Sequence, residues 1–322
     1  QVHRDFEIAI AKFKGGEDAI VWPTGYSANL GVITAIMNPP KIGPLDFFRR
    51  KGVILSDSLN HASIVDACKM SGQKVVVYKH CNTADLEKKL KKYSKRKKLV
   101  VTDGVFSMDG DVAPLDKITL LCKRYDAMLM IDEAHSTGMQ GENGHGTAER
   151  FGLEAVKDID IILGTCSKAL AATGGFVVGS KELIKYLRIA SRSYIFSTAM
   201  TPAASASLIA SLKIIESEPG IREKMWQNTE CLRAGFNSLG FDTLSSETQI
   251  IPVLIGPDDK AVEFSRRLFK RGVYAPCVRW PAVEKGKARI RFTVMATHTV
   301  EQINFLLKTC ESIGSELNLL VK

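Results

Sequence analysis

The sequence predicts an α/β protein with a mostly parallel central sheet, helices on both faces of that sheet, and a smaller C-terminal α/β domain. Short apolar runs alternate with stretches of helical spacing along most of the chain. The runs are apolar throughout, which is typical of strands buried on both faces of a parallel sheet. The 322 residues are also enough for about two domains of ~150 residues each.

The expected elements of the first domain follow one another in a regular order. We expect strands at 52–57, 74–79, 98–105, 127–134, 159–165 and 175–180. We expect helices at the start of the chain and at about 28–37, 61–71, 83–93, 115–125 and 181–189. The loop before the strand at 175–180 is too short for a parallel crossover, so we expect this strand to run antiparallel.

A long helix expected at 202–217 leads into the second domain. There we expect strands at 248–256, 272–278 and 288–296, with helices near 259–271 and 299–315. We therefore divide the chain into a large domain, residues 1–210, and a smaller C-terminal domain, residues 211–322.

Composition and charge exclude several classes of protein. No apolar run approaches the ~20 residues of a membrane span, so we expect none. The seven cysteines are widely spaced without a CxxC, and no histidines are spaced as ligand pairs. We therefore expect neither a disulfide framework nor a metal site, and a reducing, cytoplasmic location.

The net charge of +9 indicates either an acidic partner or a solvated basic face. Much of the excess lies in residues 87–98, where the spacing of Leu86, Leu90 and Tyr93 is that of a surface helix. Aromatic residues do not alternate with basic ones as a base-stacking platform requires, so nucleic acid is the weakest candidate partner. The phosphates of CoA or an acidic acyl carrier protein suit the charge better.

Polar residues follow the carboxyl ends of several expected strands, where open α/β sheets bind ligands. Lys168 lies in GTCSKALAATGG, among small residues that permit close approach of a ligand. A lysine shielded from water there can lose its proton and form a Schiff base, although it could also be an ordinary surface lysine. Asp132 could hold a protonated pyridine nitrogen, or it could be a helix N-cap. Its DEAH sequence also occurs in helicases, but no phosphate loop precedes it.

A phosphate site is suggested by Gly25 and Tyr26, which stand just before an expected helix whose N-terminus would bind anions. Thr165 would add a hydroxyl group. Together with Lys168 and Asp132, these residues supply the parts that pyridoxal 5′-phosphate requires.

At this point the sequence resembles the α-oxoamine synthases, which are fold-type I pyridoxal-phosphate enzymes. The motifs occur in the family's order and cover nearly the whole chain. They are TGYSANLG, SDSLNHASIVDA, TDGVFSMDGDVAPL, IDEAHSTGMQGENGHGT, GTCSKALAATGG, FSTAMTPA and ARIRFTVMATHT. The resemblance implies that residues 1–210 bind the cofactor.

The resemblance also implies a role for each matching residue. Lys168 would carry the Schiff base and move protons at the substrate α-carbon, and Asp132 would pair with the ring nitrogen. His135 would hydrogen-bond the ring O3′. His61 would stack on the ring and contact the substrate.

Further roles follow from the same resemblance. Gly25, Tyr26 and Thr165 would hold the phosphate, and Ser107 would contact the cofactor. Ser197 would reach the phosphate of the neighbouring subunit in a homodimer whose sites lie at the interface. Arg291 would bind the substrate carboxylate through its bidentate fork.

The implied reaction is a decarboxylative condensation of an amino acid with an acyl thioester. Within the family the sequence is most similar to 8-amino-7-oxononanoate synthase, which acts in biotin synthesis on L-alanine and on pimeloyl-CoA or a pimeloyl carrier protein. Glycine C-acetyltransferase (2-amino-3-ketobutyrate CoA ligase) and serine palmitoyltransferase are the alternatives. Other fold-type I enzymes and a non-catalytic partner subunit are further alternatives.

Two departures from the family pattern stand out. Residues 38–51 carry an insertion containing Pro39, Pro40 and Pro44, which predict a rigid loop. The family also has several dozen more residues before the segment that begins near His3, so we expect that the family's leading N-terminal arm is absent from this sequence.

Overall fold

The computed structural model describes residues 1–39 and 52–320, and the chain divides into two compact units. The first unit comprises Gln1–Val105 and Ala113–Ser217, and the second comprises Phe106–Val112 and Glu218–Lys322. The insertion expected at 38–51 lies outside the described residues from position 40 onward. The proposed domain boundary after residue 210 falls within helix α9 (Pro202–Ser217).

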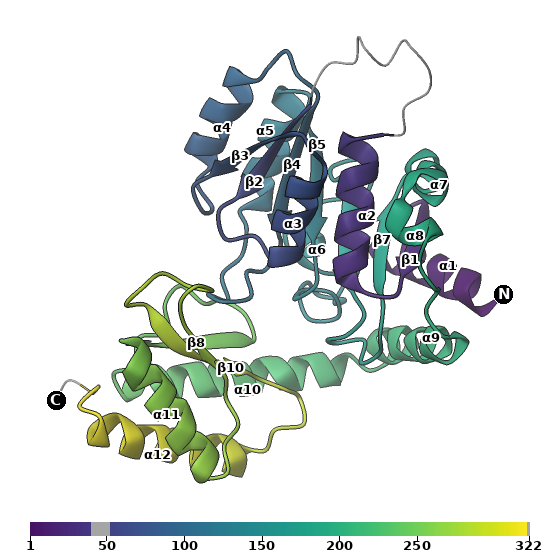
Figure 1. Cartoon of the computed structure of the whole chain (residues 1–322). Coiled ribbons are helices and arrows are strands. Elements are labelled where there is room, and N and C mark those ends of the chain that lie inside the picture. Colours follow the sequence, from purple (N-terminus) through teal and green to yellow (C-terminus); the bar gives the residue numbers. More distant parts are fainter. Residues whose placement is uncertain (40–51, 321–322) are drawn as a thin grey trace. The chain divides into compact units, whose positions relative to one another are not determined.

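A seven-stranded sheet forms the centre of the first unit, in the order β1-β7-β6-β5-β4-β2-β3 (Figure 1). Its strands are β1 (Asp18–Trp22), β2 (Val53–Asp57), β3 (Lys74–Tyr78), β4 (Lys98–Asp103), β5 (Met128–Asp132), β6 (Ile161–Thr165) and β7 (Gly175–Gly179). The strands from β3 across to β6 run parallel, and β7 runs antiparallel to β6 and β1. The mostly parallel sheet and its antiparallel strand at 175–180 are therefore confirmed.

Strand β1 is an addition to the expected elements. Its apolar residues run directly into Pro23 and then into an apolar helix, so periodicity did not separate it from its neighbours. It pairs with β7 in antiparallel register and extends the sheet by one strand.

Helices pack on both faces of this sheet. Helices α2 (Gly25–Met37), α3 (Ala62–Met70) and α7 (Lys181–Ala190) share a buried cluster with strand residues that include Leu163 and Val177. Helix α1 (Val2–Lys14) packs on β1 and β7, and its Lys14 lies over the ring of Phe176. Because Phe176 and Val177 are adjacent in a strand, they point to opposite faces, and α1 therefore lies on the other side from α2.

The longer helices of the first unit lie close to their expected positions. They are α1 (Val2–Lys14), α2 (Gly25–Met37), α3 (Ala62–Met70), α4 (Thr83–Lys92), α5 (Leu115–Arg124), α7 (Lys181–Ala190) and α9. The short helices α6 (Thr147–Arg150) and α8 (Arg192–Ile195) were not among the expected elements.

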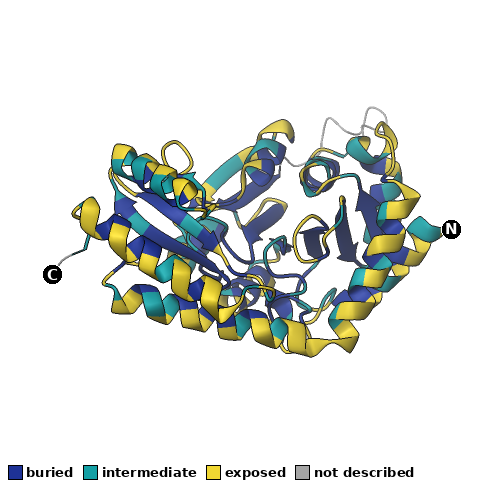
Figure 2. Ribbon diagram, turned by 90° about the horizontal axis from the view of Figure 1, so that it is seen from below, coloured by how far each residue is buried: buried dark blue, intermediate teal, exposed yellow. Residues whose placement is uncertain are grey.

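The second unit has a three-stranded antiparallel sheet in the order β8-β10-β9. Its elements are α10 (Pro219–Ser238), β8 (Ile250–Gly256), α11 (Asp258–Lys270), β9 (Cys277–Val278), β10 (Ala288–Thr293) and α12 (Val300–Glu316). Helix α10 was not among the expected elements. A separate apolar core joins the three helices to the sheet, and Figure 2 shows buried strands in both units beneath helices with exposed outer faces.

Candidate active site

The ten candidate site residues identified from the sequence are distributed over the two units. Eight belong to the first unit, namely Gly25, Tyr26, His61, Asp132, His135, Thr165, Lys168 and Ser197, and the other two, Ser107 and Arg291, belong to the second. In the first unit, Asp132 and Thr165 are the last residues of β5 and β6, so they lie at the carboxyl edge of the parallel strands.

Asp132 is a buried carboxylate held by two hydrogen bonds. Asn29 Nδ2 on α2 donates to Asp132 Oδ2 at 2.8 Å, and the Ala134 backbone N–H donates to Oδ1 at 2.9 Å. Burial raises the pKa of Asp132, while these hydrogen bonds and the positive charge of Lys168 oppose that rise. Pairing with a further cation would therefore stabilise the ionised form of the Asp132 carboxylate.

A second buried carboxylate, Asp103, lies beside Asp132, because the two are register partners at the ends of β4 and β5. Burial and the charge of Asp132 raise the pKa of Asp103 well above its ordinary value. Its Oδ2 accepts the His61 backbone N–H at 2.8 Å. Asn60 Oδ1 accepts the Asp103 backbone N–H at 2.8 Å. This network fastens the turn that carries His61 to the end of β4.

The side chain of His61 is connected to Asp132 through two polar residues. Asn29 Nδ2 also donates to Ser63 Oγ at 3.0 Å, and Ser63 Oγ lies 2.8 Å from His61 Nδ1. The Ser63 backbone N–H donates to the same Nδ1 at 3.3 Å. Since an N–H group can only donate, Nδ1 is the acceptor, and the proton of the neutral ring is on Nε2.

Lys168 lies in the loop between β6 and β7 and is exposed. The loop is closed by backbone hydrogen bonds, from Cys166 N to Gly174 O at 2.9 Å and from Ala171 N to Lys168 O at 2.9 Å. The positive charge of Lys168 lowers the pKa values of Asp132 and Asp103, which places it within their electrostatic reach.

The start of α2 forms a narrow cradle with Thr165. A Cβ atom built on Gly25 would lie 3.1 Å from Thr165 Cβ, and one on Gly175 would lie 2.6 Å from the Gly25 backbone. The Thr24 side chain caps the helix by accepting the Ser27 N–H at 3.0 Å. The backbone N–H groups of Gly25 and Tyr26 belong to the first turn of α2 and have no acceptor within that helix, so they can bind an anion.

Three further residues occupy distinct positions. The Tyr26 hydroxyl donates to Asp66 Oδ2 at 2.8 Å, so its side chain is held against α3 while its backbone stays at the start of α2. His135 is half-buried in the turn after Asp132. Ser197 is exposed and follows Phe196, whose side chain is 74 % exposed.

Arg291 and Ser107 meet within the second unit. Arg291 Nη1 donates to the Ser107 carbonyl oxygen at 3.0 Å. Arg291 is half-buried, burial lowers its pKa, and within the described residues its buried Nε has no hydrogen-bond acceptor. A guanidinium group with an unsatisfied buried donor fits a carboxylate ligand. Two positions before it, Arg289 pairs with Asp109.

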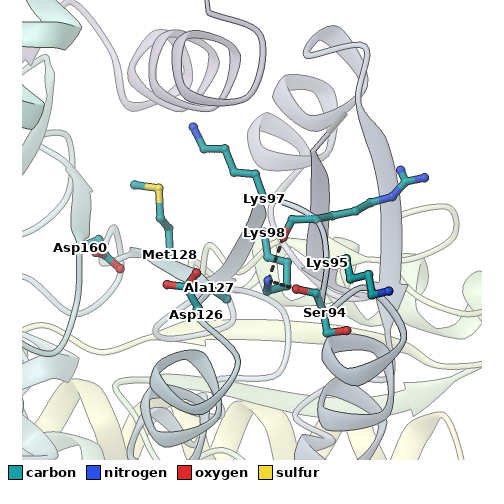
Figure 3. A pocket seen from close by; sticks show the side chains of 9 residues that line it. Ser94, Lys95, Lys97, Lys98, Asp126, Ala127, Met128 and Asp160 are labelled. Atoms are coloured by element: carbon teal, nitrogen blue, oxygen red, sulfur yellow. Dashed lines mark hydrogen bonds between the residues drawn. The ribbon is translucent and has the colours of Figure 1, made fainter. Parts of the chain in front are cut away.

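A cavity of about 490 Å³ lies at the amino ends of the parallel strands, opposite the carboxyl ends that carry Asp132 and Thr165 (Figure 3). It is lined by residues 94–98, 126–128 and Asp160, which include the first residues of β4 and β5. Strands of five or six residues separate this edge from Asp132 by about 15 Å. The basic residues 95–98 therefore do not lie near Asp132. Within this group, Lys98 Nζ donates to the carbonyls of Ser94 and Arg96 at 3.1 and 2.8 Å.

Comparison with known proteins identifies the family. The family model for aminotransferases of class I and II matches residues 1–309. The chain is 44 % identical over 319 residues to 8-amino-7-oxononanoate synthase of Lysinibacillus sphaericus, covering 99 % of this chain and 79 % of that protein. It is 43 % identical to the enzyme of that name from Thermoanaerobacter pseudethanolicus, covering 99 % and 78 %.

The chain belongs to the α-oxoamine synthase family. Solved structures agree with this assignment. Serine palmitoyltransferase of Sphingomonas wittichii superimposes with a TM-score of 0.92 at 33 % identity, covering 100 % of this chain and 78 % of that one. 8-Amino-7-oxononanoate synthase of Francisella tularensis superimposes with a TM-score of 0.83 at 25 % identity, covering 98 % and 88 %. As the sequence predicts, the protein is a pyridoxal-phosphate-dependent acyltransferase of fold-type I.

The residues of the first unit fit the α-oxoamine synthase cofactor. Asp132 is a buried acceptor with opposite charge to a protonated pyridine nitrogen, and the cradle at Gly25 and Thr165 offers N–H and hydroxyl donors without a Cβ atom in the way. Lys168 supplies an amine close enough to influence Asp132. These residues therefore offer partners for the ring nitrogen, the phosphate and the aldehyde carbon of the cofactor.

Sequence reasoning missed the residues that support this α-oxoamine synthase site. Asn29, Ser63, Asn60 and Asp103 carry the hydrogen bonds that connect His61 to Asp132 and to β4. Asn29 offered a signal, since a polar residue within the apolar helix sequence ANLGVITAIM needs a partner if it is buried. The partner itself could be identified only from the fold.

Proposed function

We propose that this enzyme is an 8-amino-7-oxononanoate synthase. It would condense L-alanine with a pimeloyl thioester, as pimeloyl-CoA or pimeloyl carrier protein, and release 8-amino-7-oxononanoate, CO2 and free CoA or carrier. The observation that carries the proposal is the identity of 40–44 % over nearly the whole chain to several proteins of that name.

Pyridoxal phosphate, when bound, supplies an electron sink that stabilises negative charge at the substrate α-carbon. The chain's own residues would bind and orient it. Asp132 would hold the proton on the ring nitrogen, and Asn29 would keep the Asp132 carboxylate in place. Gly25, Tyr26 and Thr165 would bind the phosphate.

Other residues would act on the substrate. Lys168 would accept the proton from the α-carbon, because an exposed amine beside two buried carboxylates can reach ligands at the carboxyl edge. His61, with its Nε2 proton free to donate, would contact the ring face and the substrate. His135 would donate to the ring O3′. Arg291 would bind the substrate carboxylate through the donors not used by Ser107.

The deciding experiment is product analysis by mass spectrometry with the purified holoenzyme. L-Alanine, glycine and L-serine are each offered with pimeloyl-CoA, acetyl-CoA and palmitoyl-CoA. We expect 8-amino-7-oxononanoate from alanine with pimeloyl-CoA, and no product from Lys168→Ala. Turnover of glycine with acetyl-CoA, or of serine with palmitoyl-CoA, in preference to this pair would contradict the proposal. A wild-type enzyme that binds cofactor without any turnover would indicate a non-catalytic partner subunit.

We further propose that the enzyme is a cytoplasmic homodimer in which Ser197 completes the neighbouring subunit's phosphate site. What supports the dimer is the exposed apolar pair Ile195 and Phe196, which stands next to Ser197. What supports a reducing compartment is that none of the seven cysteines, all of which lie in the described residues, forms a disulfide. No helix in the described residues has the length and apolar character needed to cross a membrane.

A further inference from the structure

Outside the candidate active site, three side chains with different ligand atoms converge at the carboxyl ends of β2 and β3. Asp57 is the last residue of β2, and His80 and Cys81 form the turn after the neighbouring strand β3. Within residues 1–39 and 52–320, they are the one group of three His, Cys, Asp or Glu residues whose ligand atoms all lie within 4.8 Å of one another. The group contains an oxygen, a nitrogen and a sulfur donor.

The carboxylate of Asp57 is buried and already oriented. Its side chain is 1 % exposed. Oδ1 accepts the Leu59 backbone N–H at 2.9 Å, and Oδ2 accepts the Cys81 backbone N–H at 2.9 Å. These two bonds hold both oxygens in position and leave two of the roughly four lone pairs of the carboxylate for other partners.

His80 presents Nδ1 to this carboxylate, 3.0 Å from Asp57 Oδ1. In the absence of a cation, Nδ1 must carry the proton and donate it to Asp57. A cation could take the place of that proton, because Nδ1 and Oδ1 would then both act as ligands. The His80 side chain is 26 % exposed, so an ion and a water molecule can reach the group from solvent.

Cys81 has a backbone conformation that is uncommon for cysteine. Its φ of +49° lies in the left-handed region, which asparagine, aspartate and glycine adopt more readily. This conformation places the Cys81 amide on Asp57 Oδ2 and keeps its thiol within 4.8 Å of the other two ligand atoms. The strain is thus associated with the convergence of all three side chains.

We propose that Asp57, His80 and Cys81 form a binding site for one Zn²⁺ ion, with water as the fourth ligand. A thiolate, an imidazole and a carboxylate are all ligands that Zn²⁺ takes in proteins, and three protein donors leave one tetrahedral position open. Binding would release the proton on His80 Nδ1 and the thiol proton of Cys81, and would tie the turn after β3 to the end of β2. No such site was expected from the sequence.

The test uses the full-length holoenzyme after removal of metals with a chelator, and Co²⁺ as a spectroscopic substitute for Zn²⁺. We expect one Co²⁺ per chain, with a thiolate-to-cobalt charge-transfer band and visible ligand-field bands typical of four ligands. Cofactor absorbance is removed by subtracting the metal-free spectrum. Zn²⁺ should abolish the cobalt bands by competition, and its affinity follows from that titration.

Three variants test which residues bind the metal ion. In Cys81→Asn the charge-transfer band should disappear, and the variant should fold because asparagine tolerates the left-handed backbone. In His80→Gln the Zn²⁺ affinity should fall by at least about tenfold, since even loss of a group behind a ligand costs 10–100-fold. Cys231→Ser, which changes an exposed cysteine on α10, should bind as wild type does. Absence of a thiolate band in the wild-type protein, or its survival in Cys81→Asn, would overturn the proposal.

Discussion

At the residue scale, Asn29 links two parts of the candidate site through its side-chain amide. Its two amide hydrogens go to Asp132 Oδ2 and Ser63 Oγ, so one side chain orients both the ring-nitrogen partner and the residue bound to His61. Asn29 is buried, so water cannot replace these donors at low cost.

We predict that Asn29→Ala lowers cofactor affinity by about 10–100-fold, because a hydrogen bond to a charged group is worth about 1.5–3 kcal/mol. The change in affinity is measured by titrating the apoenzyme with pyridoxal phosphate. Asn304→Ala, on an exposed position of α12, serves as the matched control. Equal affinities in the two variants would show that Asn29 does not support Asp132.

The buried carboxylate of Asp103 predicts a specific pH dependence. Its pKa in the folded protein is raised by burial and by the charge of Asp132. A raised carboxyl pKa stabilises the folded state below the unfolded value of about 4, and this contribution is lost as the pH rises through the folded pKa. Asp103→Asn removes that loss, while its amide oxygen can still accept the His61 N–H.

In urea unfolding of the apoenzyme, the stability of Asp103→Asn relative to wild type should therefore increase as the pH is raised from about 4 to 8. Asp85→Asn should change in the opposite sense. The pKa of Asp85 is lowered by its hydrogen bonds from Lys89 and the Lys79 backbone, so the Asp85 contribution is lost as the pH falls. If the difference in unfolding free energy between Asp103→Asn and wild type did not change with pH, the pKa of Asp103 would not be raised in the folded protein.

At the element scale, helix α1 is joined to the end of β5 by a buried ion pair. Lys14 pairs with Glu133, and both side chains are shielded from solvent. Glu133 Oε1 also accepts the Ala148 N–H at 2.9 Å. Because adjacent residues point to opposite faces of a strand end, Asp132 lies toward α2 while Glu133 lies toward α1. The pair therefore anchors the turn that leads from Asp132 to His135.

Lys14→Met should destabilise the protein by about 3–5 kcal/mol, because it leaves Glu133 buried without its cation. Lys12→Met changes an exposed lysine of the same helix and should have little effect. Thermal or urea unfolding of the two variants measures the difference. If Lys14→Met is as stable as Lys12→Met, the ion pair does not anchor this turn.

At the scale of the whole molecule, the proposed dimer makes a prediction about the exposed segment after α8. Phe196 is 74 % exposed beside Ser197, and Arg192 lies over its ring with 5.2 Å between the guanidinium carbon and the ring centroid. An aromatic side chain of that exposure is a common anchor of a protein interface.

Phe196→Asp should shift the protein from dimer to monomer, because it places a charge in the proposed interface. Phe269→Asp, at a position of similar exposure on α11, should leave the dimer intact. Light scattering coupled to gel filtration measures both masses. Dimers of unchanged stability in both variants would exclude the segment around Ser197 from the interface.

The sequence by itself determined the class of the fold and the chemistry of the site. Continuous apolar runs indicate strands buried on both faces, and a short loop before 175–180 excludes a parallel crossover, so the mostly parallel sheet followed from local information. Lys168, Asp132 and the small residues around Gly25 predicted the cofactor. They supply an amine for a Schiff base, a carboxylate for a pyridine nitrogen and a site for a phosphate, and pyridoxal phosphate requires all three.

The tertiary structure decided which atoms meet. Asn29 and Asp132 are 103 residues apart, and Lys14 and Glu133 are 119 apart. Asp57, His80 and Cys81 converge only because β2 and β3 are neighbours in parallel register. Periodicity reports whether a residue is buried, but strand order and register determine what it is buried against. For that physical reason the sequence predicted the catalytic residue types, whereas the network that holds them, strand β1 and the three-ligand cluster emerged only from the fold.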